Sequence, residues 1–471
     1  MSFKVTFIGA GSLTFTRRLL SDILSVPEFK DTEIAFTDIS RQNLDMVTEV
    51  CQQDIISNGL DIKIYSTLNR REALKNAKYV INCVRIGGLE AFETDIEIPL
   101  RYGIDQCVGD TICTGGIMYG QRGISAILEF CKDIREVCLP DVLMLNYANP
   151  NAMMTWAAIK YGKVRTLGLC HGVQGGHAQI ADALGIPQNE LDFICAGINH
   201  QTWYIQLKHK GVNVNDRVLE AFEKHERYSK TEKVRIDMLK RFGYYSTESN
   251  GHLSEYVAWY RKRPDEIEKW IDMGVWIDGE TGGYLRVCKE SRNWFDTEFP
   301  KILAEPPTVY GKRSNEHGSF IMEGLETGRC YRGHFNVMNN GCITNLADES
   351  IVEVPCYVDG NGISVPQVGE LPLGAAAVCS QSIWVQRLAV EAAVCADIQL
   401  LRQSLMMDPL TGAVCNTKEI VQMADEMLIA CAEWLPLWKK EIEKAKERIS
   451  NAKANGTYIP VKDGYEGAAR K

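Results

Sequence analysis

The segment Lys4–Leu24 constrains the fold more than any other part of the chain. An apolar, strand-like run leads directly into Gly9-Ala10-Gly11-Ser12, and helical apolar spacing follows. In such a strand–turn–helix unit the first glycine permits the tight bend and the second lets the backbone approach a pyrophosphate, which the helix N-terminus favours. The segment therefore predicts a dinucleotide-binding turn, with Gly9, Gly11 and Ser12 contacting the cofactor.

An acidic residue, Asp38, follows the next apolar run. At that place a carboxylate accepts hydrogen bonds from the adenosine ribose and repels a 2′-phosphate, so we expect NAD as the cofactor. Two departures from the usual pattern are visible: Thr14 stands in place of a third glycine, and the spacing to Asp38 is somewhat long. The alternative is a glycine-rich turn that binds nothing, with Asp38 on the surface.

The first part of the chain alternates short apolar runs with amphipathic stretches, an order typical of a parallel, doubly wound sheet. The predicted strands are Lys4–Ile8, Glu33–Thr37, Ile62–Tyr65, Tyr79–Cys83, Val142–Asn146, Val164–Leu169 and Phe193–Ile198. We therefore expect an α/β protein whose residues 1–204 form a Rossmann-like NAD-binding domain.

Beyond residue 205 the pattern changes to longer helical segments around a strand-like section. The predicted helices are Asp216–Met238, Glu266–Trp276 and Ile383–Leu405, and the strand-like section is Phe335–Val358. This order predicts a mixed α+β substrate-binding domain over residues 205–435. Residues 436–471 are expected to form a polar helical tail, with a solvated helix from Trp438 to Lys453.

Composition limits the binding partners and the cellular compartment that are expected for this protein. The net charge of −9 comes from 61 acidic and 52 basic residues without a basic block, so nucleic acid is not an expected partner. No apolar run approaches about 18 residues, which argues against a membrane span, and no export segment is recognised. The 16 cysteines are scattered through the sequence as buried thiols would be. A cytoplasmic enzyme is expected.

Two potential metal ligands, Cys170 and His200, each follow a predicted strand. Deprotonated thiolate and imidazole both bind transition metals, and two protein ligands would leave positions open for substrate hydroxyls. If the two strands end at the same edge of the sheet, these side chains could share one ion. Spacing alone leaves the alternative open that a cysteine and a histidine stand there by chance.

Four motifs together carry a resemblance to a known family. They are Gly9-Ala10-Gly11-Ser12, Leu145-Asn146-Tyr147-Ala148-Asn149-Pro150, Cys170-His171-Gly172-Val173 and Gly197-Ile198-Asn199-His200. In this order they resemble glycoside hydrolase family 4, the NAD- and metal-dependent glycosidases. The likeness continues through Gly115-Gly116-Ile117, Gly243-Tyr244-Tyr245, Thr247-Glu248-Ser249 and the run from Asn340-Gly341 to Gly362, and it covers residues 4–435.

Within that family the chain is most similar to the α-galactosidase branch, on the Cys-His-x-Val tetrad and the Thr-Glu-Ser stretch. Gly172 stands where that branch usually has serine, and a glycine there is shared with the α-glucosidase and α-glucuronidase branches. An α-glucosidase, α-glucuronidase or α-galacturonidase is therefore the alternative within the family. The branches that act on phosphorylated sugars differ at His171 and in the loop Leu89–Phe92, which disfavours a phosphorylated substrate.

The resemblance implies a reaction in which NAD oxidises sugar C3, a base removes the C2 proton, the C1 substituent is eliminated, water adds and the hydride returns. It also implies a role for each matching residue. Cys170 and His200 would bind Mn²⁺ or another divalent transition metal, and Asn149 and Asn199 would bind the sugar. Asp110 would support the base, and His171 would hydrogen-bond the leaving oxygen or a sugar hydroxyl. Glu248, or else Tyr256, would be the C2 base. A homodimer or homotetramer is implied as well.

Two readings from other functional classes remain possible. A net dehydrogenase of the lactate or malate type would release NADH as a product. A binding protein that senses NAD would not turn over any substrate, and it would not need the pair Cys170 and His200.

Overall fold

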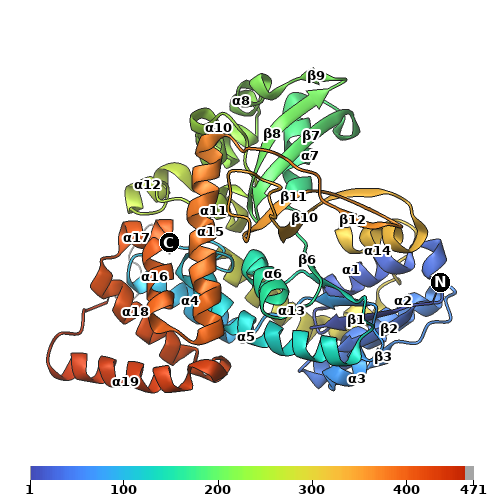
Figure 1. Ribbon diagram of the computed structural model, residues 1–471, viewed down its shortest axis with the longest axis horizontal. Coiled ribbons are helices and arrows are strands. Elements are labelled where there is room, and N and C mark those ends of the chain that lie inside the picture. Colours follow the sequence, from blue (N-terminus) through green and yellow to red (C-terminus); the bar gives the residue numbers. More distant parts are fainter. Residues whose placement is uncertain (1, 462–471) are drawn as a thin grey trace.

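The computed structural model describes residues 2–461, except the side chains of residues 292–296 and 298. A single large sheet, ordered β3-β2-β1-β4-β5-β6-β10-β11-β7-β8-β9 with β12 beside β11, organises the molecule. Figure 1 shows its first strands at the lower right and its last strands, β7–β9, at the top.

The first half of the sheet is entirely parallel. Its strands are β1 Lys4–Ile8, β2 Glu33–Thr37, β3 Tyr65–Ser66, β4 Tyr79–Asn82, β5 Leu143–Asn146 and β6 Thr166–Gly168. The order β3-β2-β1-β4-β5-β6 is that of a doubly wound dinucleotide-binding sheet, so the predicted Rossmann-like fold is confirmed. Strands β4 and β5 are buried along their whole length and β2 is buried after Glu33, as expected where helices cover both faces.

The second half of the sheet is antiparallel throughout. Its strands are β7 Leu191–Ile198, β8 Gln201–His209, β9 Val212–Asn213, β10 Tyr331–Met338, β11 Ile351–Asp359 and β12 Gly362–Ser364. The strand-like section Phe335–Val358 of the sequence is thus a hairpin of β10 and β11. The expected domain boundary at residue 204 falls inside β8.

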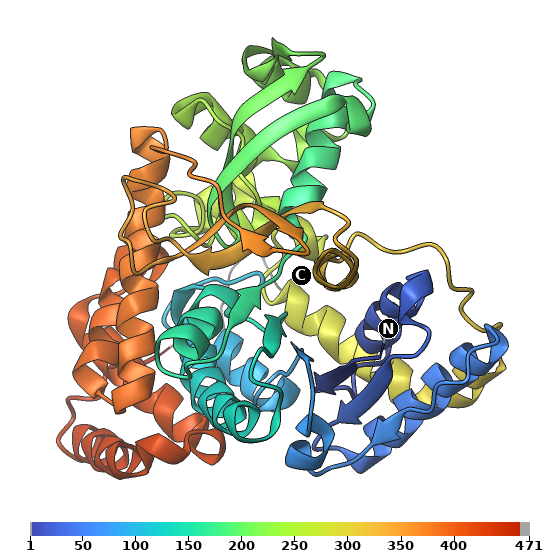
Figure 2. The ribbon, with the colours of Figure 1, turned by 45° about the vertical axis from the view of Figure 1, so that its right-hand side comes forward.

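Helices surround both halves of the sheet (Figures 1 and 2). In the first half they are α1 Leu13–Leu24, α2 Arg41–Ser57, α3 Arg70–Leu74, α4 Gly88–Arg101, α5 Cys113–Val137, α6 Asn151–Lys160 and α7 Gly172–Leu184. They continue with α8 Asn215–Lys224, α9 Tyr228–Thr231, α10 Lys233–Phe242, α11 Asn250–Leu253, α12 Pro264–Trp270, α13 Gly283–Ala304 and α14 His317–Thr327. The last are α15 Leu373–Cys395, α16 Ile398–Met407, α17 Pro409–Val414, α18 Thr417–Ala430 and α19 Lys439–Ala454.

The strand predicted at Ile62–Tyr65 is shorter and later than expected. The side chain of Gln52, on α2, donates to the carbonyl of Ile62 at 2.8 Å and accepts from the amide of Ile64 at 3.0 Å. Because these backbone groups are satisfied by a side chain, they do not pair with β2, and the strand begins only at Tyr65.

Two of the predicted helices are broken where side chains take over backbone hydrogen bonds. Asp216–Met238 divides into α8, α9 and α10. His225 Nδ1 accepts from the amides of residues 227 and 228, and Asn250 Oδ1 accepts from the amide of Val234 in the first turn of α10. Ile383–Leu405 divides at Ala396, which has φ +50°, and Asp397 then caps α16.

Of two further predicted helices, one is shorter than expected and the other has nearly the predicted bounds. The helix predicted at Glu266–Trp276 ends at Trp270, beyond which Asp272 accepts the amide of Gly274 in a turn. The tail helix is confirmed as α19, and residues 462–471 of the expected tail lie outside the described residues. Within residues 2–461, none of the helices is long and apolar enough to cross a membrane.

A buried ion pair joins α4 to α5 and yields a stability prediction. Arg122 Nη1 donates to Asp95 Oδ1 at 2.9 Å, and both side chains are 1% exposed. Arg122→Ala leaves the Asp95 carboxylate buried without its partner, so we expect a loss of about 3–5 kcal/mol in the free energy of unfolding. Arg41→Ala, at an exposed pair with Asp45, is the control and should cost about 0.5 kcal/mol or less. Equal losses in denaturant melts would contradict this account.

Candidate active site

The glycine turn after β1 has the geometry of an anion-binding turn. Gly9 has φ +86°, and a Cβ there would lie 2.9 Å from Val84 Cγ1 and 3.1 Å from the carbonyl of Cys83, beyond the neighbouring strand. Only glycine fits this position. Ser12 precedes α1, but its side chain caps none of the amides in the first helical turn. These amides point outward from the helix and are available to an anion.

Gly11 is required for a reason that the sequence did not reveal. A Cβ at Gly11 would lie 2.8 Å from Asp38 Oδ2, the oxygen that accepts the Gly11 amide at 2.8 Å. The other oxygen, Asp38 Oδ1, accepts the amide of Ser40 at 2.9 Å. Asp38 therefore ties the end of β2 to the glycine turn, and each oxygen keeps a lone pair for a ribose hydroxyl.

The two halves of the sheet meet in one row of paired residues. Gly168 on β6 is opposite Asn336 on β10, Asn336 is opposite Glu353 on β11, and Glu353 is opposite Gly197 on β7. A Cβ at Gly168 would lie 2.8 Å from Asn336 Cβ, and one at Gly197 would lie 2.5 Å from the carbonyl of Gln201. Gly168 therefore lets β6 approach β10, and Gly197 lets β7 approach β8 at the turn that contains His200.

Cys170 and His200 lie close to this row, but not for the reason expected. Three antiparallel pairings separate β6 from β7, so the two strands run in opposite directions and their carboxyl ends do not share an edge. Cys170 instead follows Gly168 shortly after β6 ends, and His200 occupies the tight turn between β7 and β8, with φ +62°. The two residues approach the junction from opposite sides.

Glu248 lies between these two residues. A Cβ atom at Gly172 would lie 3.3 Å from Glu248 Oε1 and 3.7 Å from Cys170 Sγ. The carboxylate and the thiol therefore face the same space. Burial raises the pKa of Glu248, but the nearby His200, His252 and His171 outweigh it, and the pKa falls below its ordinary value. Glu248 is therefore an ionised carboxylate in a half-buried site.

Cys170 and His200 differ in whether they carry a proton that a metal ion would have to displace. Burial, then the charges of Glu353 and Glu248, raise the pKa of the Cys170 thiol well above its usual value. Burial lowers the pKa of His200 to about 4, so its imidazole is neutral at physiological pH. A metal ion would have to displace the thiol proton but not one from His200.

Asp110 connects the predicted sugar-binding residue to the rest of the site. Its Oδ2 accepts from Asn149 Nδ2 at 3.1 Å and pairs with Arg85 Nη2 at 3.4 Å, and its Oδ1 accepts from the Thr111 hydroxyl at 2.7 Å. The Arg85 guanidinium lies over the rings of Phe92, Tyr119 and Tyr284. The structure thus brings Asn149 and Asp110 into contact, which the sequence did not predict.

His171 and the two remaining candidates differ in exposure. The His171 side chain is 67% exposed, and its Nδ1 lies 3.3 Å from Glu316 Oε1, whose hydrogen bond raises the pKa of His171. Tyr256 is 1% exposed, and its hydroxyl donates to the carbonyl of Asn199 at 3.2 Å. The Asn199 side chain is fully buried and donates to Glu353 Oε2 at 3.3 Å.

Sequence reasoning missed three residues of the site. His252 Nε2 lies 3.0 Å from His200 Nδ1, and its Nδ1 lies 2.6 Å from Glu255 Oε2. Glu353 is 1% exposed, and burial raises its pKa to about 8. Signals were present: Glu353 is a lone acid inside an apolar strand, and His252 and Glu255 are spaced to share one helical face. Within the described part of the chain, no three His, Cys, Asp or Glu side chains form a metal site by themselves.

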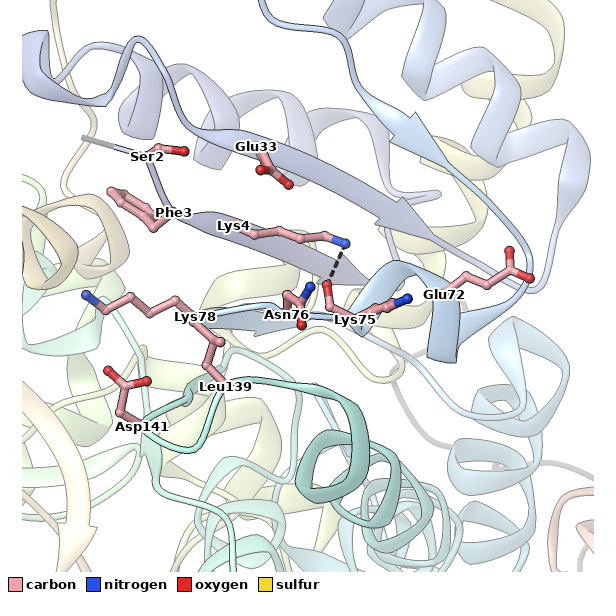
Figure 3. Close-up of a pocket in the computed structure, with 10 residues that line it drawn as sticks. All are labelled: Ser2, Phe3, Lys4, Glu33, Glu72, Lys75, Asn76, Lys78, Leu139 and Asp141. Carbon is pink, nitrogen blue, oxygen red and sulfur yellow. Dashed lines mark hydrogen bonds between the residues drawn. The ribbon is translucent and has the colours of Figure 1, made fainter.

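A hollow at the opposite edge of the sheet contains none of these residues (Figure 3). It lies where strands begin: Lys4 opens β1, Glu33 opens β2, Lys78 precedes β4 and Asp141 precedes β5. Lysine and carboxylate side chains alternate around it, and Lys4 Nζ donates to the Lys75 carbonyl at 2.9 Å. Ligands of open α/β sheets bind beyond the carboxyl ends of strands, so this hollow is not the candidate site.

Comparison with known families decides the class of protein. Residues 4–186 match the model of the family 4 glycosyl hydrolases, and residues 195–411 match the model of the C-terminal domain of the same family. The chain belongs to the family 4 glycosyl hydrolases. The resemblance inferred from the motifs around Gly9, Asn149, Cys170 and His200 is therefore confirmed.

Curated relatives of this family 4 glycosyl hydrolase include two α-galactosidases. One, from Rhizobium meliloti (strain 1021), is 56% identical over all of this chain and 95% of its own length. The other, from Bacillus subtilis (strain 168), is 34% identical over 93% of this chain and its full length.

Solved structures confirm the fold. A putative glucosidase from Bacillus subtilis superposes with a TM-score of 0.78 at 24% identity, covering 91% of this chain and all of that one. A 6-phospho-alpha-glucosidase from gut microorganisms, in complex with NAD and glucose-6-phosphate, superposes with a TM-score of 0.77 at 24% identity, covering 93% and 99%.

The contact between Glu316 and His171 yields a prediction about protonation. Glu316→Gln removes the charge that stabilises the imidazolium, so the pKa of His171 should fall, as measured by NMR titration of the ring protons. Asp182→Asn, which removes a carboxylate beside His225 instead, is the control and should leave the pKa of His171 where it is. An unchanged pKa in the Glu316 variant would contradict the assignment.

Proposed function

We propose that this family 4 glycosyl hydrolase cleaves α-galactosides with the help of NAD and a divalent ion, Mn²⁺ being the expected one. The observation that carries the proposal is the position of Glu248: an ionised carboxylate that faces the same space as Cys170 and lies among three histidines. Removal of a proton from carbon next to a ketone needs one such base and gives NAD a role, whereas direct displacement by paired carboxylates gives NAD none.

The residues at the end of β1 suit NAD. Gly9 leaves room for a close approach, and the uncapped amides of the first turn of α1 can bind a pyrophosphate. Asp38 retains lone pairs for ribose hydroxyls and would repel a 2′-phosphate. The related 6-phospho-alpha-glucosidase, described in a complex with NAD, has the same fold.

The donor set suits a divalent transition metal. A thiolate from Cys170 and an imidazole from His200 are ligands that Mn²⁺ and its neighbours in the periodic table accept. Two protein ligands leave coordination positions for the substrate. Gly172 keeps the space beside Cys170 clear, and its amide donates to Cys170 Sγ at 3.4 Å, a bond that favours the thiolate.

Each residue of the site has a defined task in such a reaction. Bound NAD and metal would supply reversible oxidation at sugar C3 and charge stabilisation at the neighbouring oxygens. Glu248 removes the proton from C2, which the neighbouring ketone makes acidic. Asn149, held by Asp110, donates to and accepts from ring hydroxyls. His171, exposed and paired with Glu316, gives a proton to the leaving oxygen.

Glu248 is a better candidate for the base than Tyr256. The Tyr256 hydroxyl is buried and donates to the Asn199 carbonyl, and burial raises its pKa well above the ordinary value. Glu248 has a lowered pKa and faces open space. We propose that Tyr256 and Asn199 support the turn that holds His200, with Asn199 at the back of the sugar site.

The α-galactoside assignment rests on the two curated relatives named α-galactosidase. An α-galacturonidase or α-glucosidase is the alternative, because relatives with those names are also similar, at 25–27% identity. We further propose that the enzyme is cytoplasmic and assembles as a homodimer or homotetramer. The assembly is inferred from the family resemblance, and the compartment from the scattered, unpaired cysteines.

A substrate panel tests the proposed function. With NAD and Mn²⁺ present, nitrophenyl α-galactoside should be hydrolysed faster than the matching α-glucoside or α-galacturonide, without NADH accumulating, as followed by absorbance. NADH formed in proportion to the substrate consumed would instead support a net dehydrogenase. NAD binding without any turnover would support a sensing protein.

Replacing the proposed base should stop the reaction without affecting the fold. Glu248→Gln keeps the shape of the side chain but removes its basicity, so kcat should fall by about 10²–10⁴-fold while NAD still binds. Glu370→Gln changes a carboxylate on an exposed loop and should leave kcat unchanged. A Glu248 variant with nearly full activity would assign the base elsewhere.

Cys170→Ser tests the proposed metal ligand. A hydroxyl is a poorer ligand than a thiolate for transition metals, so Mn²⁺ affinity and metal-dependent activity should both be lost. Cys195→Ser changes another buried thiol that lies on β7 and should leave Mn²⁺ affinity unchanged. Unchanged affinity in the Cys170 variant would exclude it as a needed ligand.

A further inference from the structure

Hydrogen bonds from one ring nitrogen of His200 run in two directions into the protein. Its Nδ1 lies 3.0 Å from His252 Nε2 and 3.3 Å from the Thr111 hydroxyl oxygen. Both paths end at carboxylates, Glu255 and Asp110, and all four partner residues are at most 2% exposed. Each bond needs one donor and one acceptor, and an ionised carboxylate can only accept. The two carboxylates therefore determine which atom along each hydrogen-bonded path carries the hydrogen.

The path through Thr111 fixes the hydrogen of His200 first. Asp110 can only accept, since it pairs with Arg85 and also accepts from Asn149. The Thr111 hydroxyl must therefore give its hydrogen to Asp110 at 2.7 Å, and its oxygen is left as an acceptor. A bond from His200 Nδ1 to that oxygen then requires the hydrogen to be on His200 Nδ1.

The path through His252 agrees with this result. Glu255 Oε1 accepts backbone amides from Cys107 at 2.6 Å, Val108 at 2.9 Å and Gly109 at 3.3 Å. Its other oxygen, Oε2, lies 2.6 Å from His252 Nδ1, which must donate to it. Because the Thr111 path places the hydrogen on His200 Nδ1, His252 Nε2 must accept it and carries no hydrogen of its own.

We propose that His252 and Glu255 are positioning residues that hold the hydrogen of His200 on Nδ1 and so present its Nε2 lone pair to a divalent cation. The proposal rests on the proposed role of His200 as a metal ligand. Outer partners of this kind fix both the tautomer and the ring orientation of a ligating histidine. His200 has φ +62° in a tight turn, so its ring needs such support from behind.

The variant Glu255→Gln should reverse the chain of hydrogens. The three amides that Oε1 accepts would hold the amide oxygen of glutamine in that place, and its NH₂ group would then face His252 Nδ1. His252 would then accept at Nδ1 and carry its hydrogen on Nε2. That hydrogen would be donated to His200 Nδ1, which could no longer carry one of its own. The favoured His200 hydrogen would move to Nε2, the nitrogen that the metal needs.

The first measurement is Mn²⁺ affinity of the full chain, from the EPR signal of free Mn²⁺ at neutral pH. Glu255→Gln should weaken binding about 10–100-fold, as losses of outer partners do. Asp408→Asn is the matched control, because Asp408 is equally buried and accepts the amides of Cys113 and Thr411 but contacts no histidine; its affinity should equal that of the wild type. Wild-type affinity in the Glu255 variant overturns the proposal.

His200→Asn separates this inference from the proposed function. If it keeps wild-type Mn²⁺ affinity, the proposed ligand is wrong; if it abolishes binding while Glu255→Gln does not weaken it, only the positioning role is wrong.

The second measurement does not depend on a variant that folds. Long-range ¹H–¹⁵N spectra of the metal-free wild type, with labelled histidine, should show His200 protonated at Nδ1 and bare at Nε2. A hydrogen on His200 Nε2, or a His252 protonated on both nitrogens at neutral pH, overturns the proposal.

Discussion

The junction between the parallel and antiparallel halves of the sheet is the constraint on which the rest of the structure depends. It consists of the row Gly168, Asn336, Glu353 and Gly197, and two of these four positions must be glycine. A side chain at Gly168 would push β6 away from β10, and one at Gly197 would collide with the backbone of Gln201 on β8. Figure 2 shows how the strands of the second half rise from this junction. Cys170 and His200 lie beside it, so the junction also sets the distance between them.

The electrostatic character of the site follows from what the junction brings together. Carboxylates of Glu248 and Glu353 lie near the Cys170 thiol and raise its pKa, while three histidines lower the pKa of Glu248. The ionised carboxylate of Glu248 thus faces the Cys170 thiol where a divalent cation is expected, and it repels the thiolate form. A bound cation would relieve that repulsion and favour the thiolate, so metal binding and the state of the base are coupled through space.

Local patterns in the sequence were sufficient for the elements and for the residues next to them. The strand and turn from Lys4 to Ser12 have the predicted structure, although the contacts that require glycine there, with Val84 at Gly9 and Asp38 at Gly11, come from distant residues. Asn149 follows β5 and Asp110 lies in the loop before α5, and their contact was not predicted. One strand began later than predicted because a distant side chain satisfied its backbone, as Gln52 does for residues 62 and 64.

The residues that could not be predicted are those that depend on strand order. The reversed direction of β7 relative to β6, the place of Glu353 beside Asn199, and the path from His200 to Glu255 all require β10 and β11 to be inserted between β6 and β7. No local pattern encodes that insertion. The family resemblance supplied roles for matching residues but gave none to His252 or Glu255, because their contribution is through another side chain.

The central claim is that a carbon-bound proton is removed during hydrolysis, and one measurement tests it most directly. Nitrophenyl α-galactoside is hydrolysed in heavy water with NAD and Mn²⁺, and the released sugar is examined by NMR for deuterium at C2. The account predicts deuterium at C2 of the product, with no hydrolysis once NAD and metal are both removed. A product that keeps its original hydrogen at C2 would contradict the account.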